Sequence, residues 1–154
     1  MENFDVVICG GAVVGSAAAY FLSAHPGFSG TVLVLEPDPT YQSCATTRSL
    51  ASIRHQFSTP GNIRMSQFGT EFIRQVGAHL AVDGNTPDVG FVEAGYLFLA
   101  SSDGLGALKA NHDVQLACGV DVALLTPEAL ARRFPWLRTD DLATAEVSTT
   151  ADAG

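Results

Sequence analysis

Length, composition and charge are those of an ordinary globular protein. The 154 residues suffice for one domain, or for one domain and part of another, and the 47% hydrophobic content can supply a core. The formal net charge of −8 argues against a surface for nucleic acid or anionic lipid, so we expect neither as a partner.

We expect neither a secretory signal nor a membrane span. Glu2 and Asp5 precede the first apolar run, where a signal peptide would be basic, and no run approaches ~20 apolar residues. The three cysteines have no CxxC spacing, which favours free thiols in a reducing compartment. We therefore expect a cytoplasmic protein, and the spacing of the histidines predicts no metal site. The oligomeric state stays open.

The first 36 residues predict a strand, a glycine turn, a helix and a second strand. Residues 4–9 (FDVVIC) and 31–35 (TVLVL) are nearly all apolar, as in strands covered on both faces of a parallel sheet. A helix is expected from about Val13 to Ala24, ended by Pro26 and Gly27. The fold class is therefore α/β, with a Rossmann-like βαβ unit at the start.

Further elements follow an irregular segment over residues 37–58. Proline at a helix start and an apolar face predict a helix from Pro60 to about Val82, and residues 83–87 then break the pattern. The later expected elements are a strand over 91–100, a helix closed by Gly119, a strand over 120–125 and a short helix ending at Pro135. The tail has no apolar periodicity, so we expect it to be disordered.

The turn after the first strand has the glycine spacing of a dinucleotide-binding loop. Gly10, Ala12 and Gly15 occupy the three positions of GxGxxG, with alanine at the middle one. The first glycine permits the tight turn, the middle position faces the pyrophosphate, and the third lets the helix pack against the strand. The helix N-terminus offers N–H groups to the phosphates. A βαβ turn that binds nothing is the alternative.

Glu36 stands at the end of the second strand, 21 residues after Gly15. That is the spacing of a carboxylate that accepts hydrogen bonds from a ribose. A carboxylate there would repel a 2′-phosphate, so FAD or NAD is preferred over NADP.

A polar segment over residues 44–58 (CATTRSLASIRHQFS) contains two arginines and many hydroxyl groups. By itself it could be an anion-binding loop or a solvated one. The order EPDPTY followed by ATTRSLASIRHQFSTPGNIRMSQFG, however, closely resembles the FAD-dependent oxidoreductases of the D-amino-acid oxidase superfamily, in its glycine oxidase, sarcosine oxidase and dimethylglycine dehydrogenase-like branch. FVEAGYLFLA and LACGVDVALLTPEALARRFPWL resemble the opening of that branch's substrate domain. The resemblance covers about residues 5–142.

The resemblance implies FAD as the cofactor and assigns residues to it. The residues implied at the pyrophosphate are Gly10, Gly11, Ala12, Val13, Val14 and Gly15, and Glu36 is implied at the adenosine ribose. The residues implied beside the pyrophosphate and the isoalloxazine are Thr46, Thr47, Ser49, Ala51 and Ser52. Gln56 would reach the flavin, and Arg54 is a candidate for holding a substrate carboxylate. Arg48 and Ala51 depart from the pattern, which has a small or apolar residue and a glycine there.

The resemblance also implies an activity: oxidation of the C–N bond of a small amine or amino acid, with hydride transfer to flavin N5. In the family, the C-terminal half completes the flavin domain and supplies most substrate residues. We therefore expect residues 1–85 to be the N-terminal part of an incomplete FAD-binding domain, residues 86–142 the beginning of an α+β substrate domain, and residues 143–154 a disordered tail. The isolated chain would then be inactive. The alternative is a small non-catalytic module that binds an adenine nucleotide through the glycine turn and Glu36.

Overall fold

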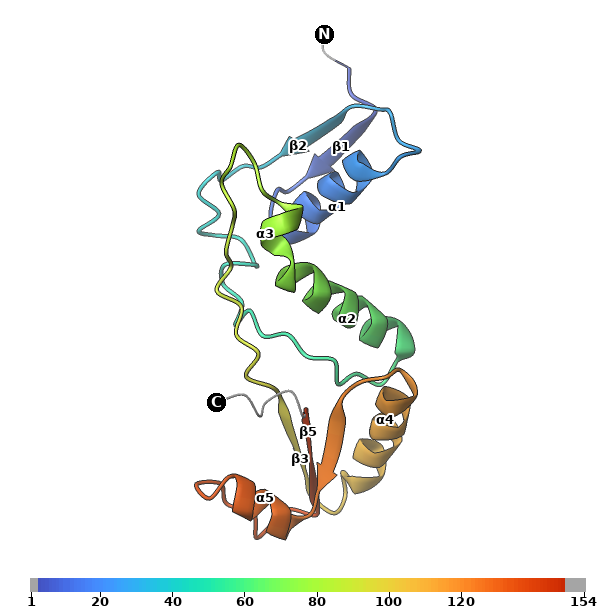
Figure 1. Cartoon of the computed structure of the whole chain (residues 1–154), viewed down its shortest axis with the longest axis vertical. Coiled ribbons are helices and arrows are strands. Elements are labelled where there is room, and N and C mark those ends of the chain that lie inside the picture. The colour runs from blue at the N-terminus through green and yellow to red at the C-terminus, as the bar shows by residue number, and fades with distance from the viewer. Residues whose placement is uncertain (1–2, 149–154) are drawn as a thin grey trace. The chain divides into compact units, whose positions relative to one another are not determined.

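The computed structural model describes residues 3–148 and contains two compact units, one spanning residues 1–52 and the other residues 53–154. Each unit has a sheet of its own (Figure 1). Within the described residues, no helix has the length and apolar character needed to cross a membrane.

The N-terminal unit is a βαβ unit with a parallel sheet. Its elements are β1 (Val6–Cys9), α1 (Val13–Ala24) and β2 (Val32–Leu35). The strands pair in parallel, from Val6 opposite Val32 to Cys9 opposite Leu35 (Figure 1). At the start of the pair, the Asp5 carboxylate accepts a hydrogen bond from the Thr31 amide at 2.7 Å, and this bond lowers the pKa of Asp5. The predicted α/β class with a Rossmann-like unit is confirmed.

Both strands are more exposed than the sequence predicts. Val7 is 51% exposed and Leu35 is 49% exposed, although strands this apolar are expected to be covered on both faces. The physical reason is that a parallel sheet needs helices on both faces, whereas the N-terminal unit contributes only α1 among the described residues. The prediction of two strands buried on both faces is therefore wrong for this chain.

The second unit has helices and an antiparallel sheet. Its elements are α2 (Pro60–Arg74), α3 (Val76–His79), β3 (Leu97–Ala100), α4 (Leu105–Ala117), β4 (Val122–Leu125), α5 (Pro127–Arg133) and β5 (Thr144–Ser148). The strand order is β3-β5-β4, and β5 is antiparallel to both neighbours (Figure 1). The core contains Ile63, Val120 and Val122, with Phe57 and Val114 packed against them. An α+β arrangement therefore follows the βαβ unit, as expected.

Two predicted elements are shorter in the structure. The helix expected to reach Val82 ends at Arg74, and a separate short helix follows. The strand expected from residue 91 begins at Leu97, because Gly95 has φ +75° and interrupts extended backbone. The helix closed by Gly119 is confirmed, since that glycine takes φ +72° just after α4.

The tail holds the central strand of the second sheet. Ala145 and Glu146 are fully buried and Val147 is 2% exposed, so β5 is covered on both faces. The expectation of disorder is therefore wrong for residues 144–148, and residues 149–154 lie outside the described part. In the sequence, the boundary between the two compact units falls between Ser52 and Ile53. The functional boundary near residue 85 stays a prediction.

The packing of α1 against β1 predicts a strong effect of one methyl group. A Cβ at Gly15 would lie 1.8 Å from the carbonyl oxygen of Gly10. Gly15→Ala should therefore lower the free energy of unfolding by about 3 kcal/mol, as for an overpacked site. Gly69→Ala is the control, because a Cβ there meets nothing within 4 Å inside α2. This control should raise stability by about 1 kcal/mol. Urea unfolding followed by circular dichroism tests both, and equal shifts would contradict the expectation.

Candidate functional site

The glycine turn is tightly constrained at its first and last positions. Gly10 has φ +101°, a conformation that side chains disfavour. Gly15 lies so close to the Gly10 carbonyl that no side chain fits between them. The backbone of the turn therefore leads directly from the end of β1 into α1, as a phosphate-binding turn requires.

The N-terminus of α1 has free hydrogen-bonding capacity. Ala12 occupies the cap position and provides no side-chain acceptor, and the first turn has no acidic residue. The Val13 amide donates to the Thr46 hydroxyl at 3.4 Å, a long and weak bond. The amide groups of the first turn are thus available to an anion, and the helix dipole favours one there.

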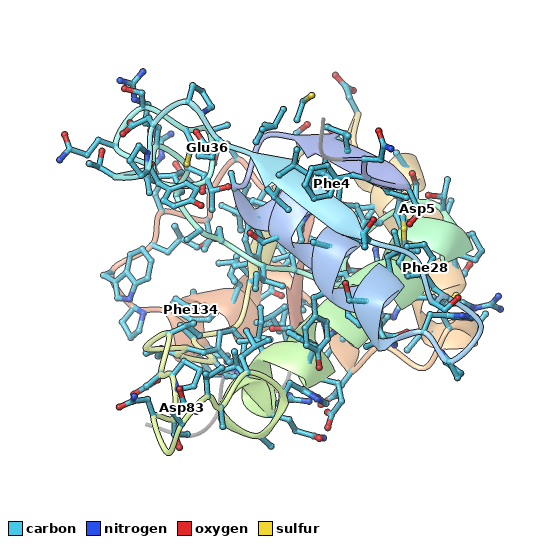
Figure 2. The ribbon with its side chains drawn as sticks, turned by 90° about the horizontal axis from the view of Figure 1, so that it is seen from above. Phe4, Asp5, Phe28, Glu36, Asp83 and Phe134 are labelled. Carbon is cyan, nitrogen blue, oxygen red and sulfur yellow. The ribbon has the colours of Figure 1, made fainter. Side chains whose placement is uncertain are left out.

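Glu36 connects the end of β2 to the glycine turn. Its carboxylate accepts a hydrogen bond from the Gly11 amide at 2.7 Å and another from the Asp38 amide at 3.0 Å. A carboxylate has about four acceptor positions, so capacity remains for two hydroxyl groups. Figure 2 shows Glu36 at one end of the β1–β2 pair and Asp5 at the other. The turn and the predicted ribose acceptor therefore meet at a single edge of the sheet.

The loop after β2 is organised by its own hydroxyl groups. Thr47 Oγ1 donates to the carbonyl of Tyr41 at 2.6 Å, and Ser49 Oγ donates to that of Thr46 at 2.8 Å. The hydrogen bond to Thr47 also lowers the pKa of the Cys44 thiol. Since Thr46 reaches the start of α1, this loop lies beside the glycine turn.

Ala51 has the conformation of a glycine. Its φ is +49°, and its amide donates to Ser49 Oγ at 3.1 Å. Ala51 therefore differs from the family pattern in residue type, but its backbone still has the left-handed conformation that glycine favours. The neighbouring Ser52 is exposed at the end of the N-terminal unit.

Arg54 and Gln56 belong to the second unit, whereas the other predicted site residues belong to the first. The Arg54 guanidinium carbon lies 4.8 Å from the ring centre of Phe57, 5.3 Å from that of Phe98 and 5.7 Å from that of Tyr96. Gln56 is 5% exposed, and its amide donates to the carboxylate of Glu146 at 3.1 Å. The structure thus brings Gly10–Gly15, Glu36 and the Thr46–Ser52 loop together and assigns Arg54 and Gln56 to a different unit.

His55 has a structural environment. Its Nε2 lies 2.8 Å from the Thr70 hydroxyl, and burial, with the nearby charge of Arg74, lowers the pKa of His55. A neutral, hydrogen-bonded imidazole is therefore favoured here.

Several residues around Arg54 could not be identified from the sequence. The sheet residues Tyr96, Phe98 and Glu146, and His112 on α4, surround the Arg54–Gln56 segment or its partners. The aromatic alternation in YLFLA was the only available signal, and it indicated a strand without indicating its partner.

Comparison with known proteins gives consistent matches. The family model described as FAD dependent oxidoreductase matches residues 5–153. The chain is similar to "FAD-dependent oxidoreductase domain-containing protein 1" of Xenopus laevis, with 43% identity over 147 residues, and to that of Bos taurus, with 42% identity over 147 residues. In both cases 94% of this chain is covered, and it spans only 30% of the relative.

Solved structures agree with these matches. The crystal structure of L-proline dehydrogenase from P. horikoshii gives a TM-score of 0.75 at 27% identity, covering 97% of this chain and 37% of that one. Glycine oxidase from Geobacillus kaustophilus gives a TM-score of 0.70 at 20% identity, covering 96% and 39%, which shows the fold alone.

The conformation of Ala51 predicts a stabilising substitution. Left-handed backbone costs a non-glycine residue about 1–2 kcal/mol, which glycine would relieve. The greater conformational freedom of glycine in the unfolded chain offsets part of this gain. Ala51→Gly should therefore raise the free energy of unfolding by about 0.5–1 kcal/mol. Ala45→Gly on the same loop is the control, because its φ is not positive, and it should be neutral or destabilising. Urea unfolding measures the free energy of unfolding of both variants. A loss of stability in Ala51→Gly would show that the backbone at Ala51 is not strained.

Proposed function

Because this chain belongs to the DAO family of FAD-dependent oxidoreductases, we propose that its N-terminal unit binds the ADP half of FAD. The family uses FAD, and the family match extends over nearly the whole chain. The chain spans about 30% of the length of the curated relatives it matches, so the activity and the substrate below are likewise proposals.

The hydrogen bond between the Gly11 amide and Glu36 carries the proposal. It fixes the ribose acceptor 2.7 Å from the backbone of the phosphate-binding turn, at the edge where α1 begins. The pyrophosphate would lie on Gly10–Gly15 and the free amides of α1, and the adenosine ribose would donate to Glu36. The cradle fits, because glycine at position 15 lets α1 approach the Gly10 carbonyl and Ala12 provides no side-chain cap for the amides.

The loop from Thr46 to Ser52 would line the cofactor beyond the pyrophosphate. Its hydroxyl groups are held by backbone carbonyls, so its shape is set before a ligand arrives. We assign Thr46, Thr47, Ser49, Ala51 and Ser52 to this role. FAD, when bound, supplies the two-electron acceptor for oxidation of a C–N bond, and the protein's task is to bind and orient.

The proposed substrate is a small amine or amino acid that carries a carboxylate. L-proline dehydrogenase and glycine oxidase, which this chain resembles in structure, are named for amino acids. Support within this chain comes from Arg54, whose guanidinium forms no ion pair among residues 3–148. A guanidinium held against aromatic rings keeps its donors free for a bidentate contact with a carboxylate.

We further propose that the 154 residues bind nucleotide without turning over substrate, since most of the relatives' length has no counterpart here. A non-catalytic adenine-nucleotide module would bind ADP and FAD equally well. An FAD site would prefer FAD, because the Thr46–Ser52 loop adds contacts beyond the ADP half. Calorimetric titration with both ligands separates the two.

Substitution of Glu36 tests the nucleotide site. Glu36→Gln places an amide donor against the donors of Gly11 or Asp38 and removes the charge. ADP binding should weaken about 10-fold to 100-fold, or roughly 1.4–2.8 kcal/mol. ADP that carries a 2′-phosphate should bind wild type less well than ADP and should lose this disadvantage in the variant. Calorimetry measures all four affinities.

Asp38→Asn serves as the control for Glu36→Gln. It removes the same charge two residues away, from a carboxylate that accepts from Thr40. Its ADP affinity should remain within about threefold of wild type. Unchanged ADP binding in Glu36→Gln would refute the ribose assignment.

Substitution of Arg54 tests carboxylate recognition. Arg54→Lys keeps the charge and loses the planar fork, so binding of glycine or L-proline should weaken about tenfold. Chemical-shift titration of the chain with each amino acid measures this. Arg64→Lys, on an exposed position of α2, should leave binding unchanged. Absence of binding by wild type, or equal affinity in Arg54→Lys, would count against the assignment.

A further inference from the structure

A cluster of buried polar side chains lies at the centre of the second unit. The Glu146 cluster consists of Gln56, His112, Gln115 and Glu146. Glu146 is fully buried, and its carboxylate accepts from Gln56 Nε2 at 3.1 Å and faces His112 Nδ1 at 2.8 Å. With its amide nitrogen turned toward Glu146, Gln115 donates to both carboxylate oxygens, at 2.8 and 3.2 Å. A buried carboxylate needs such a set of partners, and those of Glu146 come from two segments: Gln56 from the loop before α2, and His112 and Gln115 from α4.

The segment that carries Arg54 is held by side chains. Among the described residues, its backbone pairs with no strand. Ser66 Oγ on α2 donates to the Arg54 carbonyl, Thr70 bonds to His55, and Glu146 accepts from Gln56. The path of residues 54–56 therefore depends on these three contacts, and the bond to Glu146 is the one that comes from the sheet.

One face of the sheet holds both Arg54 and Gln56. Phe98 and Glu146 are cross-strand partners in the β3–β5 register, so their side chains lie on the same face. The guanidinium of Arg54 stacks on Phe98, while Gln56, two residues along, bonds to Glu146. Phe98, which supports the Arg54 guanidinium, and Glu146, which binds Gln56, are therefore neighbours on the sheet. A shift of Gln56 would move Arg54.

Among the described residues, the side chain of Arg54 donates no hydrogen bond that would keep it in place. Its Nε is buried without a hydrogen-bond partner among the described residues, and its guanidinium lies over three aromatic rings. Contacts with rings are weakly directional compared with hydrogen bonds, so they leave the orientation to the backbone. The position of Arg54 must therefore come from the anchors of its segment.

We propose that Glu146 is a positioning residue that sets the orientation of Arg54 through Gln56, with His112 and Gln115 fixing the Glu146 carboxylate. This inference rests on the carboxylate-binding role proposed for Arg54. It adds three residues to that site that touch no ligand, one of them 90 positions from Gln56 in the sequence.

The Arg54 Nε–Hε resonance tests the inference in the full chain, without flavin or amino acid. In wild type, ring currents should move this proton upfield of the other arginine Hε signals. Glu146→Gln presents donors to Gln56 and His112, and Gln56→Met removes the bond while leaving Glu146 its other donors. In each variant we expect the Hε signal to lose at least half of its upfield offset. Exchange of the pair, Gln56→Glu with Glu146→Gln, should restore it.

Glu128→Gln is the matched control, because it makes the same chemical change at an exposed carboxylate of the second unit and should leave the signal unmoved. A folded Glu146→Gln or Gln56→Met chain with unchanged Arg54 Hε would overturn the inference. If Glu146→Gln does not fold, Gln56→Met decides. Loss of folding in both, while Arg54→Lys folds, would assign the cluster to stability alone and would also overturn it. If the Hε signal changes as expected but the chain binds no amino acid, the result would count against the proposed function only.

Discussion

The close approach of α1 to the end of β1 is the constraint on which the candidate cofactor site depends. With 1.8 Å between the Gly10 carbonyl oxygen and any Cβ at Gly15, the helix can begin directly at the turn only if both positions are glycine. That approach aims the free amides of α1 at the sheet edge where Glu36 lies. The dipole of the helix, the backbone of the turn and the carboxylate therefore act on one small region. A longer turn would separate them.

The second unit depends on a different kind of interaction. A carboxylate with no exposure to solvent is costly unless donors surround it, and removal of one partner of such a group is strongly destabilising. Glu146 meets this requirement with donors from the Arg54 segment and from α4. Apolar packing around Ile63 and Val122 gives the unit its core, while the polar cluster fixes which segment lies against the sheet. The two units are thus held together in different ways. The first depends on the absence of a side chain at Gly15, and the second depends on buried polar side chains around Glu146.

Much of the N-terminal unit could be predicted because its signals are local. The strand, turn, helix and second strand are contiguous, and Glu36 is identified by its spacing from Gly15. The resemblance has glycine where Ala51 stands, and the structure gives Ala51 a positive φ, which the sequence did not predict. The extent of strand burial could not be predicted, since it depends on what covers Val7 and Leu35.

The second unit was harder to predict because its decisive contacts are distant. The segment TAEVS is short, and its glutamate is typical of an exposed position, so the sequence favours a disordered tail. Only the pairing of β5 with β3 and β4 shows that this glutamate is internal. The resemblance implies that Gln56 reaches the flavin, which stays a prediction, and the partner that occupies its amide lies 90 residues away, beyond any sequence pattern.

The central place of β5 bears on how the chain acquires its structure. Among the strands of residues 3–148, β3 and β4 are not neighbours, and each pairs with β5 alone. The sheet of the second unit therefore cannot form until residues 144–148 have been synthesised. Gln56 likewise finds its partner Glu146 only after 90 further residues have been made. Closure of such distant pairs is slow compared with the formation of local helices. During that interval α2 and α4 can form while their apolar faces stay uncovered, which makes this the period of greatest risk of aggregation.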